Sequence, residues 1–265
     1  MTPISSPEPP PPISCFIIAR DEVDRIGRTI EAIQPHVAEV LVVDSGSTDG
    51  TVELCHSLGA RVLTNAWPGY GPQKRFAERA CLNDWVLNLD ADEVVTPELA
   101  AEIRALFSSG EPDHPFYRFK VVTVYPGHDR PRLWADWYNV LRIYDRRQGG
   151  FRDSLVHDSV VPGDVRPRQL HGIVHHHCYR SLGHLAAKQD RYTRLQSVEL
   201  TKPRPYLVLR LITEFPLAFV KYYFMRRQFT GGRFGLGVAA ILAYYRTVRV
   251  WRLLTARGRD ALPDA

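Results

Sequence analysis

The sequence predicts an α/β fold with a mostly parallel sheet, helices between its strands and a helical extension at the C-terminal end. Two observations carry this expectation. Short apolar runs alternate with amphipathic stretches over residues 13–107, which is typical of parallel strands joined by right-handed helical crossovers. Beyond residue 180, long apolar segments studded with arginines replace the strand patterns. With 265 residues, the chain has room for one such domain and an appendage.

The elements of the first half follow one another closely. Strands are expected at 13–19, 40–43, 61–64 and 84–89, and helices at 23–35, 52–59, 73–81 and 97–107. After residue 107, apolar stretches are separated by Gly, Pro and Asp turns without intervening helices. They predict strands at 116–124, 138–144, 155–161 and 169–177. These strands indicate mixed or antiparallel additions to the parallel sheet.

The chain divides into three predicted segments. Residues 1–12 are rich in proline and lack the basic and apolar regions of a signal peptide, so we expect a disordered lead. Residues 13–180 form the α/β domain, and residues 181–265 form a helical region that Ser181 can cap. The four cysteines lie far apart, which fits reduced core residues better than disulfides or a metal cage.

Charge is distributed unevenly along the chain. Residues 181–265 contain 15 Lys and Arg against 5 Asp and Glu, a net charge of +10, while residues 1–180 carry a net charge of −5. A basic segment of this kind usually faces an anionic partner. Its arginines are interleaved with long aliphatic runs instead of forming a polar stripe, which favours an anionic membrane surface over nucleic acid.

Two long apolar segments of this region, 206–229 and 234–254, are expected to lie in the membrane interface. Charged residues interrupt both segments, so neither is typical of a helix that crosses a bilayer. Their apolar side chains can share one face while Arg226, Arg227 and Arg233 reach anionic head groups. The alternative is that these helices pack on one another or on the sheet.

An apolar run that predicts a buried strand ends in three carboxylates, Asp90, Asp92 and Glu93. So much charge is unfavourable at the end of a core strand unless a cation or a phosphate-bearing ligand meets it there. Two aspartates separated by one residue can reach one divalent cation, and their hard oxygen ligands suit Mg²⁺ or Mn²⁺ rather than zinc. The alternative is that Asp92 and Glu93 cap the helix that begins at Pro97.

A second polar turn, DSGSTDGT, begins at Asp44 after the strand at 40–43. It places backbone amides and small hydroxyls at a helix start, and Asp44 can accept hydrogen bonds from a ribose or a base. The same residue types occur in any tight turn or N-cap, which is the alternative interpretation. Because the carboxyl ends of parallel strands meet at one edge of a sheet, Asp44 and Asp90 together predict a nucleoside pocket beside a metal pocket.

Four motifs, in this order and at this spacing, resemble a known family: IIARDE, VVDSGSTDGT, GYGPQKRFA and LNLDADE. The chain resembles glycosyltransferase family 2, whose GT-A fold is a Rossmann-like mixed sheet that serves inverting nucleotide-diphospho-sugar transferases. The later stretches YRFKVV, LRIYDR, LVHDSV and HHHCYRSLGHLAAKQDRY resemble the lipopolysaccharide core β-glucosyltransferase subgroup. The resemblance implies a GT-A catalytic domain at 13–180 and a membrane-associating or acceptor region at 181–265.

The resemblance also implies roles for individual residues. Asp92, helped by Asp90, is expected to hold Mg²⁺ or Mn²⁺ on the donor diphosphate. The uridine pocket and the rest of the nucleotide are expected to be contacted by Ala19, Asp21, Glu22, Asp44, Gln73 and Lys74. The chain departs from the family at two positions, because Asp21 and Arg75 each stand where Asn is usual. Asp in place of Asn exchanges hydrogen-bond donors for acceptors, which affects donor recognition.

A carboxylate on the acceptor side is expected to act as general base by accepting the proton of the attacking hydroxyl. Asp158 is the candidate because the related enzymes have His-Glu at this motif, and Asp153 and Asp136 are the reserves. His157 is a further candidate contact to the metal or the diphosphate, with an ordinary strand histidine as the alternative. The histidines at 175–177 are expected to form a polar strand, since consecutive strand residues point to opposite faces and cannot all share one zinc.

Together these observations predict an inverting, metal-dependent glycosyltransferase. It is expected to move a hexose, with glucose favoured, from a UDP-sugar to a lipopolysaccharide-core or other glycolipid acceptor. Its expected location is the cytoplasm, peripheral on the inner face of the cytoplasmic membrane. Two alternatives remain open: a non-catalytic nucleotide-sugar-binding or scaffolding protein, and the same chemistry on a polyprenyl-linked sugar, a capsule precursor or a protein. The sequence does not indicate an oligomeric state.

Overall fold

The computed structural model describes residues 9–152, 159–199 and 203–255. The chain forms two compact units. The first, which we call the sheet unit, contains the chain up to residue 122 together with 137–177. The second, the helical unit, contains 123–136 and the chain from residue 178 onward. The helical unit therefore includes a segment that the sequence had placed within the catalytic domain.

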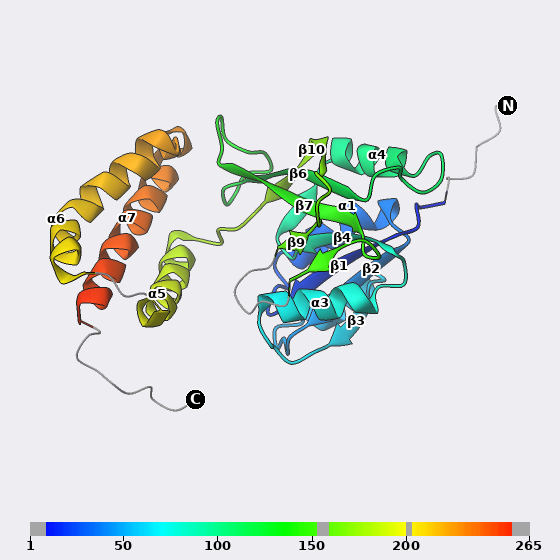
Figure 1. The fold of residues 1–265 in the computed structure, drawn as a ribbon, viewed down its shortest axis with the longest axis horizontal. Coiled ribbons are helices and arrows are strands. Elements are labelled where there is room, and N and C mark those ends of the chain that lie inside the picture. Colours follow the sequence, from blue (N-terminus) through cyan, green and yellow to red (C-terminus); the bar gives the residue numbers. More distant parts are fainter. Residues whose placement is uncertain (1–8, 153–158, 200–202, 256–265) are drawn as a thin grey trace. The chain divides into compact units, whose positions relative to one another are not determined.

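Eight strands of the sheet unit form one sheet in the order β3-β2-β1-β4-β7-β6-β10-β5 (Figure 1). Its first half is parallel and consists of β3 (Arg61–Thr64), β2 (Glu39–Asp44), β1 (Ile13–Ala19) and β4 (Trp85–Asp90). The other half contains β7 (Trp137–Asp145), β6 (Phe116–Thr123), β10 (Arg168–His176) and β5 (Glu93–Val95). Because β7 is antiparallel to both β4 and β6, the predicted mixed α/β sheet is confirmed.

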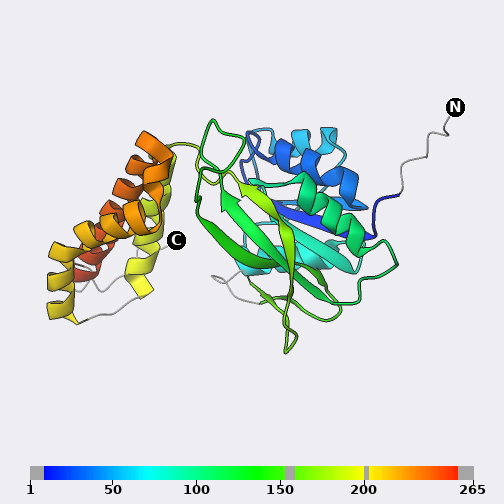
Figure 2. The same cartoon turned by 90° about the horizontal axis from the view of Figure 1, so that it is seen from above.

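Helices cover both faces of this sheet (Figure 2). Successive residues of a strand point to opposite faces, so β1 contributes to two cores. Its residues Ile13, Cys15 and Ile17 pack with the first, to which α1 (Ile26–Ile33), α2 (Thr51–Ser57) and α4 (Pro97–Leu106) contribute. Its Phe16 packs with the second, beneath α3 (Tyr70–Ala80) and the small hairpin of β8 (Gly150–Phe151) and β9 (Val160–Val161).

Most element boundaries agree with the sequence patterns, and the differences have local causes. α3 begins at Tyr70, three residues before the apolar pattern starts, because its first turn is polar and glycine-rich. β5 was not expected, since three residues are too few for a recognisable alternation. Of the strand expected at 155–161, only the last two residues form β9, and residues 155–158 lie outside the described part of the chain.

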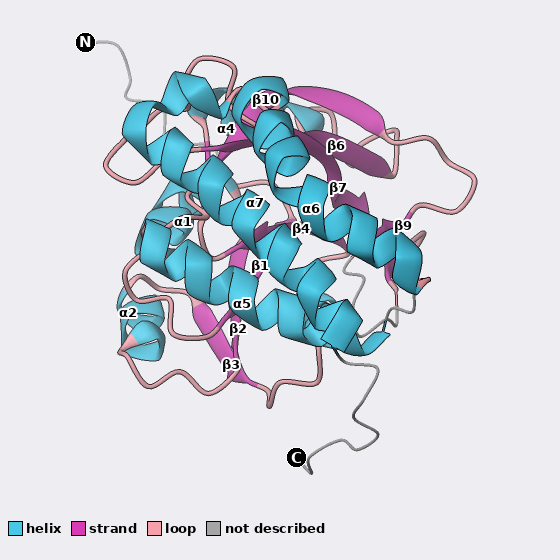
Figure 3. Ribbon diagram, turned by 90° about the vertical axis from the view of Figure 1, so that its left-hand side faces the viewer, coloured by secondary structure: helices cyan, strands magenta, loops and turns pink. Residues whose placement is uncertain are grey.

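The helical unit contains α5 (Leu182–Glu199), α6 (Arg204–Val220) and α7 (Gly232–Thr255), which Figure 3 shows side by side. α7 packs against both α5 and α6. A π-helical turn (Lys221–Met225) and a 3₁₀ turn (Gln228–Gly231) connect α6 to α7. As expected, Ser181 caps α5, because its Oγ accepts a hydrogen bond of 3.0 Å from the amide of His184. Within the described helices, none combines the length and apolarity needed to span a bilayer.

Candidate functional site

Three parallel strands end at the same edge of the sheet unit, as the alternating pattern predicted. Ala19 at the end of β1 is in register with Asp44 at the end of β2, and Ile18 is in register with Asp90 at the end of β4. Ala19 and Asp44 are buried, while the side chain of Asp90 is 33% exposed. This edge therefore brings together the predicted nucleotide-binding turn and the predicted acidic strand end.

The carboxylate of Asp44 organises its own turn. Its Oδ2 accepts hydrogen bonds of 2.8 Å from the amides of both Gly46 and Ser47, and its Oδ1 accepts one from the Ser47 hydroxyl. Asp21 joins the same turn, because its amide donates to Ser47 Oγ and its Oδ1 accepts from the amide of Thr48 at 2.9 Å. The backbone of Asp21 has a positive φ of 54°, a conformation that Asp tolerates better than most residues. These contacts lock the first two polar loops into one surface.

Gln73 connects α3 to that surface from within the core. Its side chain is fully buried, and its Nε2 donates to Ser45 Oγ at 3.0 Å and to the carbonyl of Asn65 at 3.2 Å. Its Oε1 accepts from Asn65 Nδ2 at 2.6 Å. The side-chain amide of Gln73 is thus fully used in hydrogen bonds within the protein, and these bonds stabilise the loops that follow β2 and β3.

Asp90 is held between two cations. Its Oδ1 lies 2.9 Å from the Nζ atom of Lys74, whose side chain is 1% exposed, and its Oδ2 lies 3.1 Å from Nη2 of Arg142. Burial acts to raise the pKa of Asp90, but the charges of Lys74 and Arg142 outweigh it and hold that pKa far below its ordinary value. Asp90 is therefore ionised and positions two positive charges at the strand end.

Asp92 lies between a histidine and an arginine. Its Oδ1 is 3.4 Å from Nε2 of His176, and its Oδ2 accepts a hydrogen bond of 2.9 Å from Nη1 of Arg25. Arg25 also pairs with Glu22, so the carboxylate predicted to face the nucleotide is linked to Asp92 through one guanidinium. Burial acts to raise the pKa of Asp92, but the hydrogen bond and charge of His176, together with Arg25, lower it overall.

His176 is a site residue that the sequence pattern did not distinguish from its neighbours in the run 175–177. It lies on β10, in register with Glu93 of β5, and its Nδ1 is 3.3 Å from the hydroxyl of Tyr138 on β7. Burial acts to lower the pKa of His176, but the hydrogen bond and charge of Asp92 raise it above its ordinary value. In the sequence, the histidine run at 175–177 was the only indication of a site residue on this strand. The pairing of β10 with β5 places the middle histidine beside Asp92.

Glu93 supports the strand end and does not cap a helix. It is fully buried, and its Oε2 accepts a hydrogen bond of 3.0 Å from the amide of Asp90. Its Oε1 lies 3.3 Å from Nη2 of Arg142. The other terminal nitrogen of Arg142, Nη1, donates to Oδ1 of Asn88. The N-cap of α4 is instead Thr96, whose Oγ1 accepts from the amide of Leu99. The alternative interpretation, that Asp92 and Glu93 cap this helix, is wrong, because the short strand β5 separates them from the helix start.

Of the residues predicted to act as the general base, the structure describes only Asp136. Asp158, His157 and Asp153 lie outside the described residues. Asp136 belongs to the helical unit, where its Oδ2 accepts from Nη2 of Arg132 at 3.0 Å and also from the side-chain amide of Gln228. Burial raises the pKa of Asp136, although Arg132 opposes the shift.

At the end of β4, the protein can supply only part of the ligand set of a divalent cation. In the described ranges, no group of three or more His, Cys, Asp or Glu side chains could hold a metal by itself. Oδ1 of Asp92 and Nε2 of His176 face each other at 3.4 Å, so a cation that displaced the proton between them would meet one oxygen and one nitrogen ligand, whereas both oxygens of Asp90 face Lys74 and Arg142. Mg²⁺ is commonly bound by one or two carboxylates plus substrate phosphates, so a partial donor set of this kind fits a cation that arrives with a phosphorylated substrate.

Comparisons with known proteins show the family of this chain. The model of the family described as "Glycosyl transferase family 2" matches residues 14–167. An uncharacterized glycosyltransferase of Rickettsia prowazekii is 38% identical over 251 residues, covering 91% of this chain and 86% of the relative. The lipopolysaccharide core biosynthesis glycosyltransferase LpsC of Rhizobium meliloti is 30% identical over 278 residues, covering 96% of this chain and 97% of the relative.

Among solved structures, the similarity is limited. Glucosyl-3-phosphoglycerate synthase from Mycobacterium tuberculosis, solved with Mn²⁺, UDP and glucosyl-3-phosphoglycerate, is 28% identical. The match covers 44% of this chain and 45% of that chain, with a TM-score of 0.34. A likeness of this extent has no bearing on the site, which rests on the residues and contacts described above.

Proposed function

Because the chain belongs to glycosyltransferase family 2 and is a glycosyltransferase with a GT-A type mixed α/β fold, we propose that it transfers a hexose, with glucose favoured, from a UDP-sugar to a lipopolysaccharide-core glycolipid. The observation that carries the proposal is the pairing of Asp92 with His176 beside the Lys74–Asp90 ion pair. The pairing sets two candidate cation ligands next to a buried positive charge at the carboxyl edge of the sheet, where ligands of such folds bind.

The charges of the site suit the departure of a nucleoside diphosphate. Lys74 and Arg142 present fixed positive charges that Asp90 orients, and Arg25 neutralises one oxygen of Asp92. A Mg²⁺ or Mn²⁺ ion held by Asp92 and His176 would stabilise the negative charge that builds on the leaving diphosphate. The turn at Asp44 supports the nucleoside side, where its backbone amides are already fixed by hydrogen bonds.

Inversion at the anomeric carbon requires a base on the acceptor side to accept the proton of the attacking hydroxyl. Asp158 remains the proposed base, with His157 as a proposed contact to the metal or diphosphate, on the resemblance of the LVHDSV stretch. Asp136 is the weaker reserve, because its carboxylate already accepts from Arg132 and Gln228.

The proposed acceptor rests on one relative. LpsC carries lipopolysaccharide core biosynthesis in its name and aligns over nearly the full length of both chains. The same transfer to a polyprenyl-linked sugar, a capsule precursor or a protein is the alternative. The acceptor that becomes labelled in the experiment below decides between these alternatives.

The proposed location is the inner face of the cytoplasmic membrane, bound through the helical unit. In this unit, α6 and the turn that follows it expose large apolar side chains: Ile212 is 77% exposed, Leu217 67% and Met225 74%. Lys221 and Arg226 lie in the same stretch of chain and can reach anionic head groups. Apolar side chains that are exposed in this number usually mark a binding surface.

Sugar transfer by the full-length chain tests the catalytic proposal. The protein is incubated with a panel of labelled nucleotide sugars, Mn²⁺ and lipopolysaccharide-core acceptor, and we expect label from a UDP-hexose in the glycolipid. Asp92→Asn should abolish transfer, while Asp113→Asn, on an exposed residue remote from the strand tip, should leave it unchanged. Full activity of Asp92→Asn, or activity that is unchanged by a chelator, contradicts the metal role.

Vesicle flotation tests the location. We expect the chain to float with vesicles that contain phosphatidylglycerol and to be released by high salt, since screening weakens binding to a charged surface. Ile212→Gln combined with Leu217→Gln should reduce flotation, and Val165→Gln in the sheet unit serves as the control for loss of an exposed apolar side chain. Failure of the unaltered chain to float at low salt contradicts the membrane proposal.

A further inference from the structure

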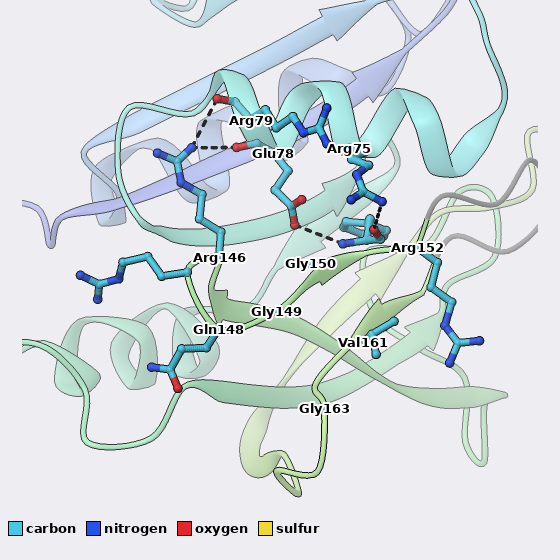
Figure 4. Close-up of a pocket in the computed structure, with 12 residues that line it drawn as sticks. Arg75, Glu78, Arg79, Arg146, Gln148, Gly149, Gly150, Arg152, Val161 and Gly163 are labelled. Carbon is cyan, nitrogen blue, oxygen red and sulfur yellow. Dashed lines mark hydrogen bonds between the residues drawn. The ribbon is translucent and has the colours of Figure 1, made fainter.

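A polar cavity lies between α3, the turn after β7 and the β8–β9 hairpin. Its volume is about 860 Å³, which is within the range of small-molecule sites. Trp85 at the start of β4 is in register with Asp145, and the turn that follows Asp145 forms one wall of the cavity. At its other side the cavity reaches Phe151, whose ring centroid lies 5.5 Å from Nζ of Lys74, the partner of Asp90. It is lined by Arg75, Glu78, Arg79, Arg146, Arg147, Gln148, Gly149, Gly150, Phe151, Arg152, Val161 and Gly163 (Figure 4).

Among the residues that the structure describes, five arginines and one acid, Glu78, line this cavity. Two of the arginines have structural partners. Arg146 donates to the carbonyls of Glu78 and Cys81 at 2.9 Å and so closes the C-terminal end of α3. Arg147 pairs with Asp145 and Glu111 at 2.8 Å each. These two side chains are accounted for by the fold.

The other three arginines form no ion pair with a carboxylate in the described part of the chain. Arg75 donates to the carbonyl of Phe151 at 3.2 Å and interacts electrostatically with Glu78. Arg79 and Arg152 are exposed. Arg75 and Arg79 are four residues apart and so share one face of α3. Figure 4 shows them on the helix, with Arg152, which directly follows β8, across the cavity.

Glu78 offsets part of the charge of Arg75, but the hydrogen bonds of its carboxylate serve the fold. Its Oε1 accepts hydrogen bonds from the hydroxyl of Tyr144 at 2.6 Å and from the amide of Phe151 at 3.2 Å. The side chain is buried, and burial raises its pKa. This acid thus holds the β8–β9 hairpin against α3 and β7.

The wall opposite α3 is fixed by two glycines. A Cβ atom on Gly149 would lie 2.6 Å from the carbonyl oxygen of Val161 and 2.7 Å from the ring of Phe116. A Cβ atom on Gly150 would lie 2.9 Å from Oε2 of Glu78. Only glycine permits this close approach, so the backbone itself forms a firm wall opposite the arginines.

We propose that this cavity is a second anion site, which binds the phosphoryl group of a small phosphorylated ligand through Arg75, Arg79 and Arg152. A guanidinium fork matches two phosphate oxygens at once, and several forks suit the oxygens of a dianionic phosphate better than one carboxylate. The concave shape favours a small molecule over a flat membrane. The three arginines are not among the residues proposed for sugar transfer, although Phe151 of the cavity contacts Lys74 of the donor site.

Calorimetric titration of the full-length chain tests the site at constant ionic strength. Inorganic phosphate, glucose 6-phosphate and glucose are the probes, so that free phosphate and a phosphoryl group on a sugar are distinguished. The Arg79→Gln, Arg152→Gln double variant should bind phosphate at least about tenfold more weakly, as expected for the loss of two charge-assisted contacts. The charge-matched control is the Arg130→Gln, Arg166→Gln double variant, because both residues are exposed and lie outside the cavity.

Because the donor site could also bind phosphate, a third variant distinguishes phosphate binding at the donor site from phosphate binding in the cavity. Lys74→Gln should lose UDP binding and keep the phosphate binding that depends on Arg79 and Arg152. Binding of both phosphate and glucose 6-phosphate identifies a phosphorylated sugar as an accepted source, whereas binding of phosphate alone identifies free phosphate. Unchanged phosphate affinity in the Arg79 and Arg152 double variant, or glucose bound as tightly as glucose 6-phosphate, overturns the proposal.

Arginine modification locates the site directly. Phenylglyoxal reacts with accessible guanidinium groups, and mass spectrometry of the resulting peptides reports each arginine separately. Phosphate should protect Arg79 and Arg152 from modification but leave Arg130 and Arg166 reactive. Equal protection of all four residues would show non-specific screening and would also reject the site.

Discussion

The Nε2 atom of His176 lies 3.4 Å from Oδ1 of Asp92, although the two residues are 84 positions apart in the sequence. β10 pairs with β5, and β5 follows directly after the acidic strand tip, so the histidine is brought to the carboxylate by strand pairing. The opposite oxygen of Asp92 is held by Arg25. The carboxylate therefore has a fixed orientation and one oxygen directed at a nitrogen donor.

Replacement of His176 by Gln is expected to reduce sugar transfer by about 10²-fold or more, since a cation at the leaving group stabilises the transition state by several kcal/mol. It should also weaken the thermal stabilisation that Mn²⁺ and UDP produce together. His175→Gln is the matched control, because the adjacent residue of β10 points to the other face of the sheet. Equal loss in the two variants would assign the effect to strand structure.

Arg142→Met is expected to destabilise the sheet unit by about 3 kcal/mol or more, because it leaves the fully buried Glu93 without its cation. Urea denaturation followed by circular dichroism measures the change. The second substitution Glu93→Gln should restore a large part of the loss, since it removes the buried charge and keeps an acceptor for the amide of Asp90. Additive losses in the double variant would show that the two side chains do not act as a pair.

Two glycines give a matched pair of stability predictions. A Cβ atom on Gly172 of β10 would overlap the backbone of Leu99 in α4, so Gly172→Ala should cost about 2–3 kcal/mol through overpacking. A Cβ atom on Gly27 of α1 would meet only the side chains of Leu54 and Leu58, at 3.6 and 3.8 Å. Gly27→Ala should therefore be neutral or stabilising by up to about 1 kcal/mol, since Ala is the better helix former. Thermal unfolding of both variants checks the contrast.

Glu214 is expected to give the helical unit an acid-sensitive ion pair. It lies on α6, pairs with Arg210, and its Oε1 accepts a hydrogen bond of 2.6 Å from Nε of Arg246 on α7. Burial acts to raise the pKa of Glu214, but its hydrogen bonds with the two arginines lower it overall.

Because the folded-state pKa of Glu214 is lowered, its contribution to stability is present above the unfolded value of about 4.3 and is lost as the pH falls through the folded value. Helix content measured against temperature from neutral to acidic pH should show this loss in the unaltered chain. The variant Glu214→Gln should melt earlier at neutral pH and show a smaller change on acidification. A pH dependence identical in the two proteins would contradict the role of the ion pair.

The sequence alone determined the α/β class, the succession of strands and helices along the first half of the chain, and the acidic end of the strand at Asp90. These features depend on local periodicity and on residues close together in the chain. It also indicated that Asp44 and Asp90 meet at one sheet edge, since parallel strands with helical crossovers permit little else. The family resemblance supplied candidate roles for Gln73 and Lys74, whose buried contacts then became visible only in the structure.

The tertiary structure decided which residues meet across the antiparallel half of the sheet. Nothing local distinguishes His176 from its neighbours, and the register of β10 on β5 selects it, since a shift of one residue would turn it to the other face. The same pairing buries Glu93 against Arg142 and makes it a support for the strand tip. The cavity with Arg75, Arg79 and Arg152 was equally hidden, because it depends on α3 and the β8–β9 hairpin, which are far apart in the sequence and close together in space.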